Sequence, residues 1–347
     1  MRKLLVLALI TMVAFSANAQ EEKKDSIDPN KPVFTVIKEN PITSVKNQNR
    51  SGTCWCFSTL SFFESEILKK TGKTYDLCEM FVCNKDYMDR AVLKVRMHGD
   101  AQFAQGGSAG DVLHIIKKYG ICPENAMPAP GSLYGDTLAN FGEFFSVLEP
   151  YVDAVAKSSA KTISNTWKKG FQGILDAYLG ECPESFTYEG KTFSPKSFAA
   201  SLGLDFNDYV SITSYTHHPF YTAFPVEVQD NWRQDLSWNV PMEEMAEIID
   251  NAIMNGYTIA WGGDVSGDGF TRSGLAIWAD LDTAPTAAGT DMDRWLGLSK
   301  TERQDKAKEL GVNVVEKKPS QEQRQNEFDN WTLTDDHGMV IFGIAKD

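Results

Sequence analysis

Histidine and basic residues are both scarce in this sequence, and the two shortages narrow the classes of function. The 347 residues include only 5 histidines, so a histidine in a defined motif is a strong candidate for acid–base chemistry. The 34 Lys and Arg residues are outnumbered by 47 Asp and Glu residues, which gives a net charge of -13. Because no basic stripe is present to neutralise phosphates, nucleic acid is excluded as a partner and anionic membranes are disfavoured.

Cysteine is too rare to build the fold. Six cysteines in a chain of this length are too few for a disulfide scaffold. Cys78 and Cys83 lie in one predicted helix and point in different directions, which disfavours a bridge between them. If one cysteine is a free nucleophile, an odd number remains, and these cannot all pair within the chain.

Long apolar runs are absent except at the N-terminus. Arg2 and Lys3 precede an apolar stretch at 4–15, and Ala17-Asn18-Ala19 has the small-x-small pattern that signal peptidases cut. The run is too short to span a bilayer comfortably, and charged residues follow it. We therefore expect a signal peptide at 1–19 with cleavage near Ala19–Gln20. The mature protein is expected to be secreted or periplasmic and not membrane-bound.

The patterning of the remaining chain predicts an α+β fold, because helices come first and strands later. The predicted divisions are a flexible leader at 20–32, a helical part with the nucleophile at 33–128, a helical insertion at 129–206, and a β-rich part at 207–347 that carries a polar insertion at about 283–327.

Apolar spacing places the individual elements. Helices are predicted at 54–70, 78–95, 109–119, 138–158, 160–179, 242–254 and 300–310. A further helix is predicted to begin at Pro195 and run to Leu202, with Ser194 as its N-cap. Strands are predicted at 33–38, 209–214, 257–262 and 339–345.

One segment combines the features that a thiol nucleophile needs. Residues 48–58 read Q-N-R-S-G-T-C-W-C-F-S, and Cys54 opens a predicted helix. The dipole and the unpaired N–H groups at a helix start favour a thiolate. Gly52 leaves room for a carbonyl, while the Cys54 N–H and the Gln48 amide can hold an oxyanion. Cys56 falls on the opposite, buried face and is interpreted as a structural thiol.

This segment resembles the nucleophile segment of the papain superfamily of cysteine peptidases, which has a glutamine six residues before the cysteine of a Cys-Trp pair. Other segments resemble family motifs in the family's order: residues 42–48, Leu77-Cys78-Glu79, Gly106-Gly107 with Tyr119-Gly120-Ile121, and Asp336-His337-Gly338-Met339-Val340. Together they extend from residue 42 to the C-terminus.

The resemblance implies a papain-like fold, with a helical part and a β-barrel-like part. It implies that Cys54 is the nucleophile, that His337 is its base, and that Gln48 assists at the oxyanion. It further implies that Gly106, Gly107 and Asp336 contact the substrate, with both glycines pairing with an extended substrate backbone. The implied activity is that of a thiol peptidase working through an acyl-enzyme.

Two further features are similar to the bleomycin hydrolase and aminopeptidase C branch: the helical insertion and the segment Thr216-His217-His218-Pro219-Phe220. The short leader points the same way, because it leaves no room for a papain-like inhibitory propeptide. This resemblance implies removal of N-terminal residues from peptide substrates. It also implies a homo-hexameric ring, which this branch often forms with its active sites facing inward.

The family's third catalytic residue is not found beyond the histidine. In the family it is an asparagine in an Asn-Ser-Trp-Gly segment, and this chain ends at Asp347 without one. Because that asparagine orients the imidazole, its absence is expected to slow catalysis. The last barrel strands and the C-terminal arm that enforces exopeptidase specificity are also missing. Two alternatives follow: a truncated form of a longer peptidase, which the intact Cys54 and Gln48 favour, or a catalytically impaired peptide-binding homologue.

No metal or cofactor is predicted. His217 and His218 are neighbours in sequence, so they are expected to point apart and make a poor chelate. Asp264 to Gly269 begins like a calcium loop, but Leu275 stands where a bidentate carboxylate is needed. No phosphate-binding glycine loop is present.

Overall fold

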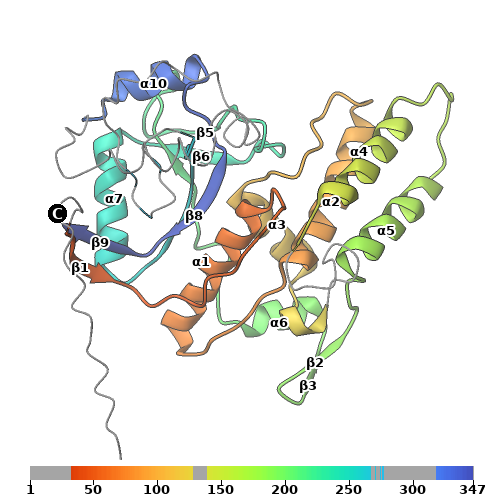
Figure 1. Ribbon diagram of the computed structural model, residues 1–347, viewed down its shortest axis with the longest axis horizontal. Helices are drawn as coiled ribbons and strands as arrows, with labels where there is room; N and C mark the ends of the chain where they lie inside the picture. The colour runs from red at the N-terminus through yellow and green to blue at the C-terminus, as the bar shows by residue number, and fades with distance from the viewer. Residues whose placement is uncertain are drawn as a thin grey trace, which may run out of the picture.

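The chain was analysed as a computed structural model that describes residues 33–127, 139–266 and 318–346, together with residues 270, 274 and 276. The predicted signal peptide, the leader, the 300–310 helix and most of the polar insertion lie outside the described residues. In Figure 1 the helices α2, α4 and α5 lie on one side, and most strands with α7 and α10 lie on the other. No helix of the described residues is long and apolar enough to cross a bilayer.

The helical part forms where the apolar spacing predicted it. It comprises α1 (Cys54–Thr71), α2 (Glu79–Arg96), α3 (Ala109–Tyr119) and the 3-10 turn η1 (Glu124–Ala126). α1 ends at Gly72, which takes the left-handed conformation (φ 69°) and donates its N–H to the Leu68 carbonyl at 2.8 Å. Lys69 and Lys70 in the last turn complement the helix dipole.

The segment after residue 139 adds two long helices to the same core. α4 (Gly142–Ala156) and α5 (Thr166–Leu179) both pack on α2. Buried residues of all three helices and of α1 belong to one apolar cluster. α5 begins later than predicted, because the hydroxyls of Ser158 and Ser164 accept nearby backbone N–H groups and stabilise turns instead. The insertion therefore extends the helical part.

The insertion is not wholly helical, contrary to the prediction. Strands β2 (Phe186–Tyr188) and β3 (Lys191–Phe193) form a hairpin. Its two-residue turn is Glu189-Gly190, both with positive φ, as a primed turn requires. Three-residue strands are too short to show a period of two, so the pattern gave no signal. The following helix α6 (Pro195–Ser201) is confirmed, with the Ser194 hydroxyl accepting the Ser197 N–H at 3.2 Å.

The remaining strands form small sheets around α7 (Met242–Met254). β4 (Ile212–Thr213), β6 (Leu236–Asn239) and β5 (Ala223–Pro225) make a three-stranded sheet in the order β4-β6-β5. β7 (Ile259–Gly263) pairs antiparallel with β8 (His337–Ile341), and β1 (Thr35–Glu39) pairs with β9 (Gly343–Lys346). α10 (Gln321–Asp329) shortly precedes β8. The α+β prediction is thus confirmed, whereas the closed barrel stays a prediction.

The predicted single strand at 339–345 is two strands. The chain turns at Phe342, whose carbonyl accepts the Asn40 N–H at 2.8 Å. β8 therefore pairs with β7, while β9 pairs with β1 at the start of the described chain. A continuous apolar run cannot reveal such a change of partner, because both strands are apolar.

Candidate active site

Cys54 is the first residue of α1 and is half-buried. α1 has no side-chain cap and no acidic residue in its first turn, whereas the hydroxyls of Ser194 and Ser320 cap α6 and α10. The positive end of the helix dipole is therefore not neutralised by a carboxylate there, which favours a thiolate at Cys54. Cys56 is fully buried, and burial raises the pKa of its thiol well above the ordinary value. None of the six cysteines is in a disulfide.

His337 is the first residue of β8, and this strand packs beside α1 (Figure 1). The approach is close at the next residue: a Cβ on Gly338 would lie 3.3 Å from the carbonyl carbon and oxygen of Cys54. It would also lie 2.8 Å from the Ser58 hydroxyl. Glycine at 338 therefore lets the strand carry His337 up to the helix end that bears Cys54.

Gln48 lies on the loop that leads into α1. Its Nε2 donates to the Ser51 carbonyl at 2.7 Å, and the Ser51 hydroxyl donates to the Gln48 carbonyl at 2.8 Å. The loop is thereby folded back on itself. An amide nitrogen has two hydrogens, so Nε2 keeps a second donor for an oxyanion.

A second loop packs against the nucleophile segment through Gln105. Its side-chain carbonyl accepts the Gly52 N–H at 2.7 Å, and its backbone carbonyl accepts the Trp55 indole N–H at 3.0 Å and the Tyr87 hydroxyl at 3.1 Å. The two residues that follow, Gly106 and Gly107, are thus held beside the start of α1.

Both glycines are required by close neighbours. A Cβ on Gly106 would meet the Asp230 carboxylate, with Oδ1 at 2.7 Å. A Cβ on Gly107 would lie 2.5 Å from an Arg90 guanidinium nitrogen and 2.9 Å from the Trp55 ring. The Gly107 N–H donates to the Asp230 carboxylate. That donor is therefore directed at Asp230, and the pairing of both glycines with a substrate strand stays a prediction.

Asp230 is a half-buried carboxylate beside this loop, and neighbouring groups only partly offset the cost of its negative charge. Burial, reinforced by the negative charge of Asp335, raises its pKa from 3.8 to about 7, although Arg90 and the Gly107 N–H favour the charged form. A titratable group shifted by burial beside a substrate loop is a candidate functional group.

Arg90 of α2 holds in place the loop that carries Gly106 and Gly107. This buried guanidinium pairs with Asp86 at 2.7 Å and with Asp111 at 3.3 Å, and donates to the Ala104 carbonyl at 3.2 Å. Its charge also faces the rings of Trp55 and Trp232, at 5.9 and 5.2 Å. Arg90 thus contacts both the loop of the predicted substrate glycines and Trp55 in the first turn of α1.

Asp336, the other predicted substrate residue, has a contact within the strand pair. Its Oδ1 accepts the Val265 N–H at 3.0 Å, just beyond the β7–β8 pairing of Gly263 with His337. This bond holds together the strand ends from which His337 emerges.

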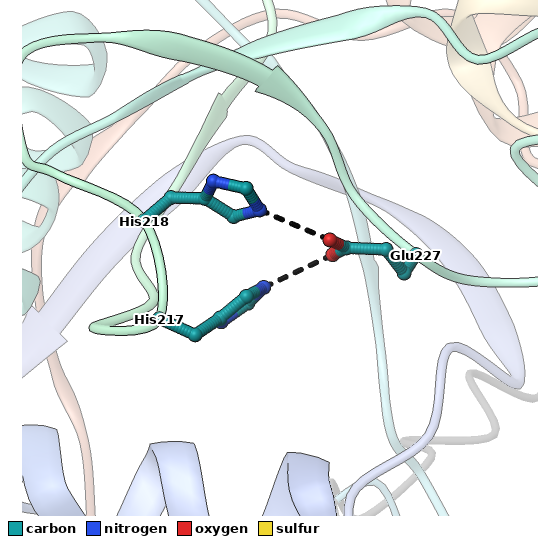
Figure 2. A group of neighbouring side chains, drawn as sticks. All are labelled: His217, His218 and Glu227. Carbon is teal, nitrogen blue, oxygen red and sulfur yellow. Dashed lines mark hydrogen bonds and ion pairs between the residues drawn. The ribbon is translucent and has the colours of Figure 1, made fainter.

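The expectation that His217 and His218 point apart is wrong. Figure 2 shows both imidazoles directed at Glu227, with each Nε2 3.0 Å from a different carboxylate oxygen. The chain bends at 216–218, so the alternation of an extended strand does not apply.

A surface groove of about 770 Å³ lies between α2, α3 and the 228–234 segment. Neither Cys54 nor His337 lines it, so it is distinct from the candidate active site. Sequence reasoning missed Gln105, Arg90 and Asp230. Gln105 directly precedes the Gly-Gly pair and was open to recognition, whereas Asp230 comes from a segment far along the chain with no motif of its own.

Comparison with known proteins agrees with this geometry. A model of the Peptidase C1-like family matches residues 5–346. Aminopeptidase C of Lactobacillus delbrueckii subsp. lactis is 24% identical over 374 residues, covering 90% of this chain and 78% of that protein. Aminopeptidase G of the same organism is 24% identical over 302 residues, covering 76% and 68%.

A solved structure is similar in fold. The crystal structure of PepW from Lactobacillus rhamnosis HN001 matches with a TM-score of 0.58 and 17% identity, covering 91% of this chain and 73% of that one. The resemblance predicted from the motifs is confirmed by the family match and these relatives. Since the family match covers almost the whole sequence, this chain belongs to the Peptidase C1-like family.

Proposed function

We propose that the chain is a thiol aminopeptidase in which Cys54 attacks the first peptide bond of its substrate. The observation that carries the proposal is the close approach of β8 to the start of α1, where Gly338, the neighbour of His337, lies against Cys54. His337 takes the thiol proton, and Cys54 forms an acyl-enzyme. His337 then returns the proton to the leaving amine, and water releases the acyl group. The Cys54 N–H and the Gln48 amide stabilise the oxyanion.

Asp230 supports removal of single N-terminal residues. In the extended mode expected from the resemblance, the Gly107 N–H would bind a substrate carbonyl further toward the N-terminus. Here that N–H donates to Asp230 instead. The carboxylate thus occupies this donor and offers a negative charge to the α-ammonium of a bound peptide. The relatives named above are aminopeptidases, which agrees with this specificity.

We also propose that the enzyme acts after export and assembles as the predicted hexamer. The N-terminal sequence pattern supports export, and family resemblance supports the ring. N-terminal sequencing of the secreted protein is expected to begin near Gln20. Light scattering of the purified protein is expected to give six times the mass of one chain.

The activity is tested with aminoacyl amides that release a fluorophore, offered with a free or an acetylated α-amino group. We expect turnover of the free substrates by the intact protein and at least a 10³-fold loss in Cys54→Ala, because that change removes the nucleophile. Cys182→Ala is the matched control, since Cys182 is also half-buried and outside any disulfide. A thiol-directed epoxide is expected to label Cys54.

Two outcomes contradict the proposal. A folded, reduced protein with no Cys54-dependent turnover is a peptide-binding homologue. Turnover of acetylated and free substrates at equal rates indicates an endopeptidase and removes the role given to Asp230.

A further inference from the structure

His217, His218 and Glu227 place three metal-ligating groups together on the β-rich part, and none of them has a role in the proposed peptidase mechanism. One ligand atom from each lies within 4.8 Å of the other two. The side chains come from two segments, the bend after β4 and the stretch after β5, and converge as Figure 2 shows. Both imidazoles present the same atom, Nε2, to the carboxylate at 3.0 Å.

The spacing suits a small divalent ion. Nitrogen and oxygen ligands of tetrahedral Zn²⁺ lie about 2.0–2.2 Å from the metal, which puts two ligands about 3.3 Å apart. The observed separations of 3.0 Å between each Nε2 and its carboxylate oxygen are close to this value. The three ligand atoms lie within 4.8 Å of one another, so the ion would enter with side-chain adjustments that bring all three to this spacing.

The imidazoles are held in place by their surroundings. His217 stacks on Phe328 with an interplanar angle of 17°, and His218 stacks on Phe224 at 24° with the ring centroids 4.1 Å apart. Stacking on a ring from another element fixes each imidazole plane. The ligand set is consequently preorganised.

Gln325 supplies the outer contact that a metal-binding histidine requires. Its amide lies against the His217 Nδ1, with Oε1 at 3.3 Å and Nε2 at 3.1 Å. The amide is buried, accepts the Thr216 N–H at 2.6 Å and donates to Asp329 at 2.9 Å. Metal binding at Nε2 leaves the proton on Nδ1, and the Gln325 carbonyl can accept it.

We propose that His217, His218 and Glu227 form a binding site for a divalent transition metal, with Zn²⁺ as the best match. Two imidazoles and one carboxylate are a donor set that favours Zn²⁺ over Ca²⁺ or Mg²⁺, which prefer oxygen ligands throughout. The side chains of the three ligands are 29%, 36% and 53% exposed, so water reaches the fourth position.

The ion would cross-link three parts of the fold. It joins the 216–218 bend to the segment that continues from Glu227 to Asp230. Through the contact of His217 with Gln325 it is also linked to α10, which precedes the His337 strand. Binding energy gained only by the folded state stabilises that state. The role we assign is therefore structural, and it does not depend on the proposed peptidase activity.

The test measures Zn²⁺ binding by calorimetry on the untagged protein. Cys54→Ser serves as the parent protein, because a thiol–imidazole pair can itself bind zinc. We expect one high-affinity ion per chain and a melting temperature raised by several degrees. His218→Gln and Glu227→Gln in this parent are each expected to weaken binding about 100-fold. Gln325→Ala is expected to weaken it about 10- to 100-fold, as is usual for outer contacts.

His114→Gln is the matched control, because His114 lies 3.6 Å from one carboxylate, Asp89, and has no second imidazole beside it. Binding is expected to be unchanged in this variant. Co²⁺ bound in place of Zn²⁺ is expected to give a tetrahedral visible spectrum without a thiolate charge-transfer band. Unaltered zinc affinity in Glu227→Gln, which changes one exposed side chain, would overturn the proposal. So would the absence of binding by the Cys54→Ser parent at millimolar Zn²⁺.

Discussion

Ionisation of the Asp230 carboxylate destabilises the folded state. Its folded pKa of about 7 lies above the ordinary 3.8, so the native state holds a proton between these values that the unfolded state has released. Stability contributed by this group is thus present below about pH 4 and is lost as the pH rises to 7. A residue that costs stability at neutral pH while touching the substrate loop has the character of a functional group.

We therefore expect Asp230→Asn to gain stability and lose specificity. Above pH 7 the variant should be more stable than the parent, because it has no charge to desolvate, and the difference should vanish toward pH 4. Its kcat/KM for free N-terminal residues should fall about 10- to 100-fold, the value of a charge-assisted hydrogen bond. Denaturant unfolding and paired assays on free and acetylated substrates measure both effects.

The pH profile provides an independent check. In the parent, the ratio of activity on free to acetylated substrates should rise through pH 7 as Asp230 ionises. It should fall above about pH 8 as the substrate α-amino group loses its proton. Titration of Cys54 and His337 affects both substrates alike and cancels in the ratio. A ratio independent of pH, in parent and variant alike, would show that Asp230 does not contact the amine.

At the residue scale, local motifs could be predicted from sequence and remote contributions could not. Cys54, Gln48 and His337 each stand in a short sequence motif. Their roles could be predicted because each motif combines a suitable side chain with its place in the chain: a thiol at a helix start, an amide before it, and an imidazole at a strand start. Asp230 reaches Gly106 only through the tertiary fold. The convergence of His217 and His218 depends on a backbone bend that no side-chain pattern encodes.

The pairing of β7 with β8 allows a test of how closely β8 must approach α1 for catalysis. Gly262 and Gly338 are direct partners in the register. A Cβ on Gly338 would press on Ser58 and Cys54, whereas a Cβ on Gly262 would meet nothing within 4 Å. Gly338→Ala should therefore push β8 and His337 away from α1 and reduce kcat/KM about 100-fold, the effect of a displacement of about 1 Å.

Gly262→Ala is the control from the same pair of strands. It should keep full activity and change the unfolding free energy by less than about 1 kcal/mol, since the added methyl group has free space. Steady-state kinetics and denaturant unfolding of both variants decide the matter. Equal activity in the two variants would mean that β8 tolerates the shift and that its close approach to α1 is not needed.

The elements that could be predicted were those that pack against the same neighbours along their whole length. The helices Ala109–Tyr119 and Met242–Met254 begin and end where their apolar periodicity does. The hairpin Phe186–Phe193 and the division at Phe342 escaped prediction, because short strands and changes of pairing partner leave no periodic trace. Tertiary pairing, and not local propensity, determines both.

At the scale of the whole molecule, α1 joins the helical part to the β-rich part. α1 contacts helices α2 and α3 as well as strands β7 and β8. Lys69 near its C-terminal end donates to the Asn255 carbonyl at 3.0 Å and lies over the Tyr257 ring. Since α1 packs on both parts, we expect them to unfold together.

Asn40 is a buried polar link in this connection. It is 2% exposed, and its Nδ2 donates to the carbonyls of Ile253 and Tyr257, both at 2.9 Å. Its own N–H bonds the Phe342 carbonyl between β8 and β9. The Asn40 side chain thus ties the segment before the nucleophile to α7 and to the turn before β7, and its backbone N–H ties the same segment to the junction of β8 and β9.

Asn40→Ala should lower the unfolding free energy by about 1–2 kcal/mol, because the Ile253 and Tyr257 carbonyls each lose one hydrogen bond, the first buried and the second part-buried. Unfolding should stay a single transition, and activity per folded molecule should persist at low temperature. Asn255→Ala is the matched control: its Nδ2 donates to the Asn251 carbonyl at 2.7 Å on the exposed surface, so a change below about 0.5 kcal/mol is expected. Circular dichroism and tryptophan fluorescence followed through one denaturant titration measure both quantities. If Asn40→Ala splits the transition in two, this side chain couples parts that α1 alone does not hold together.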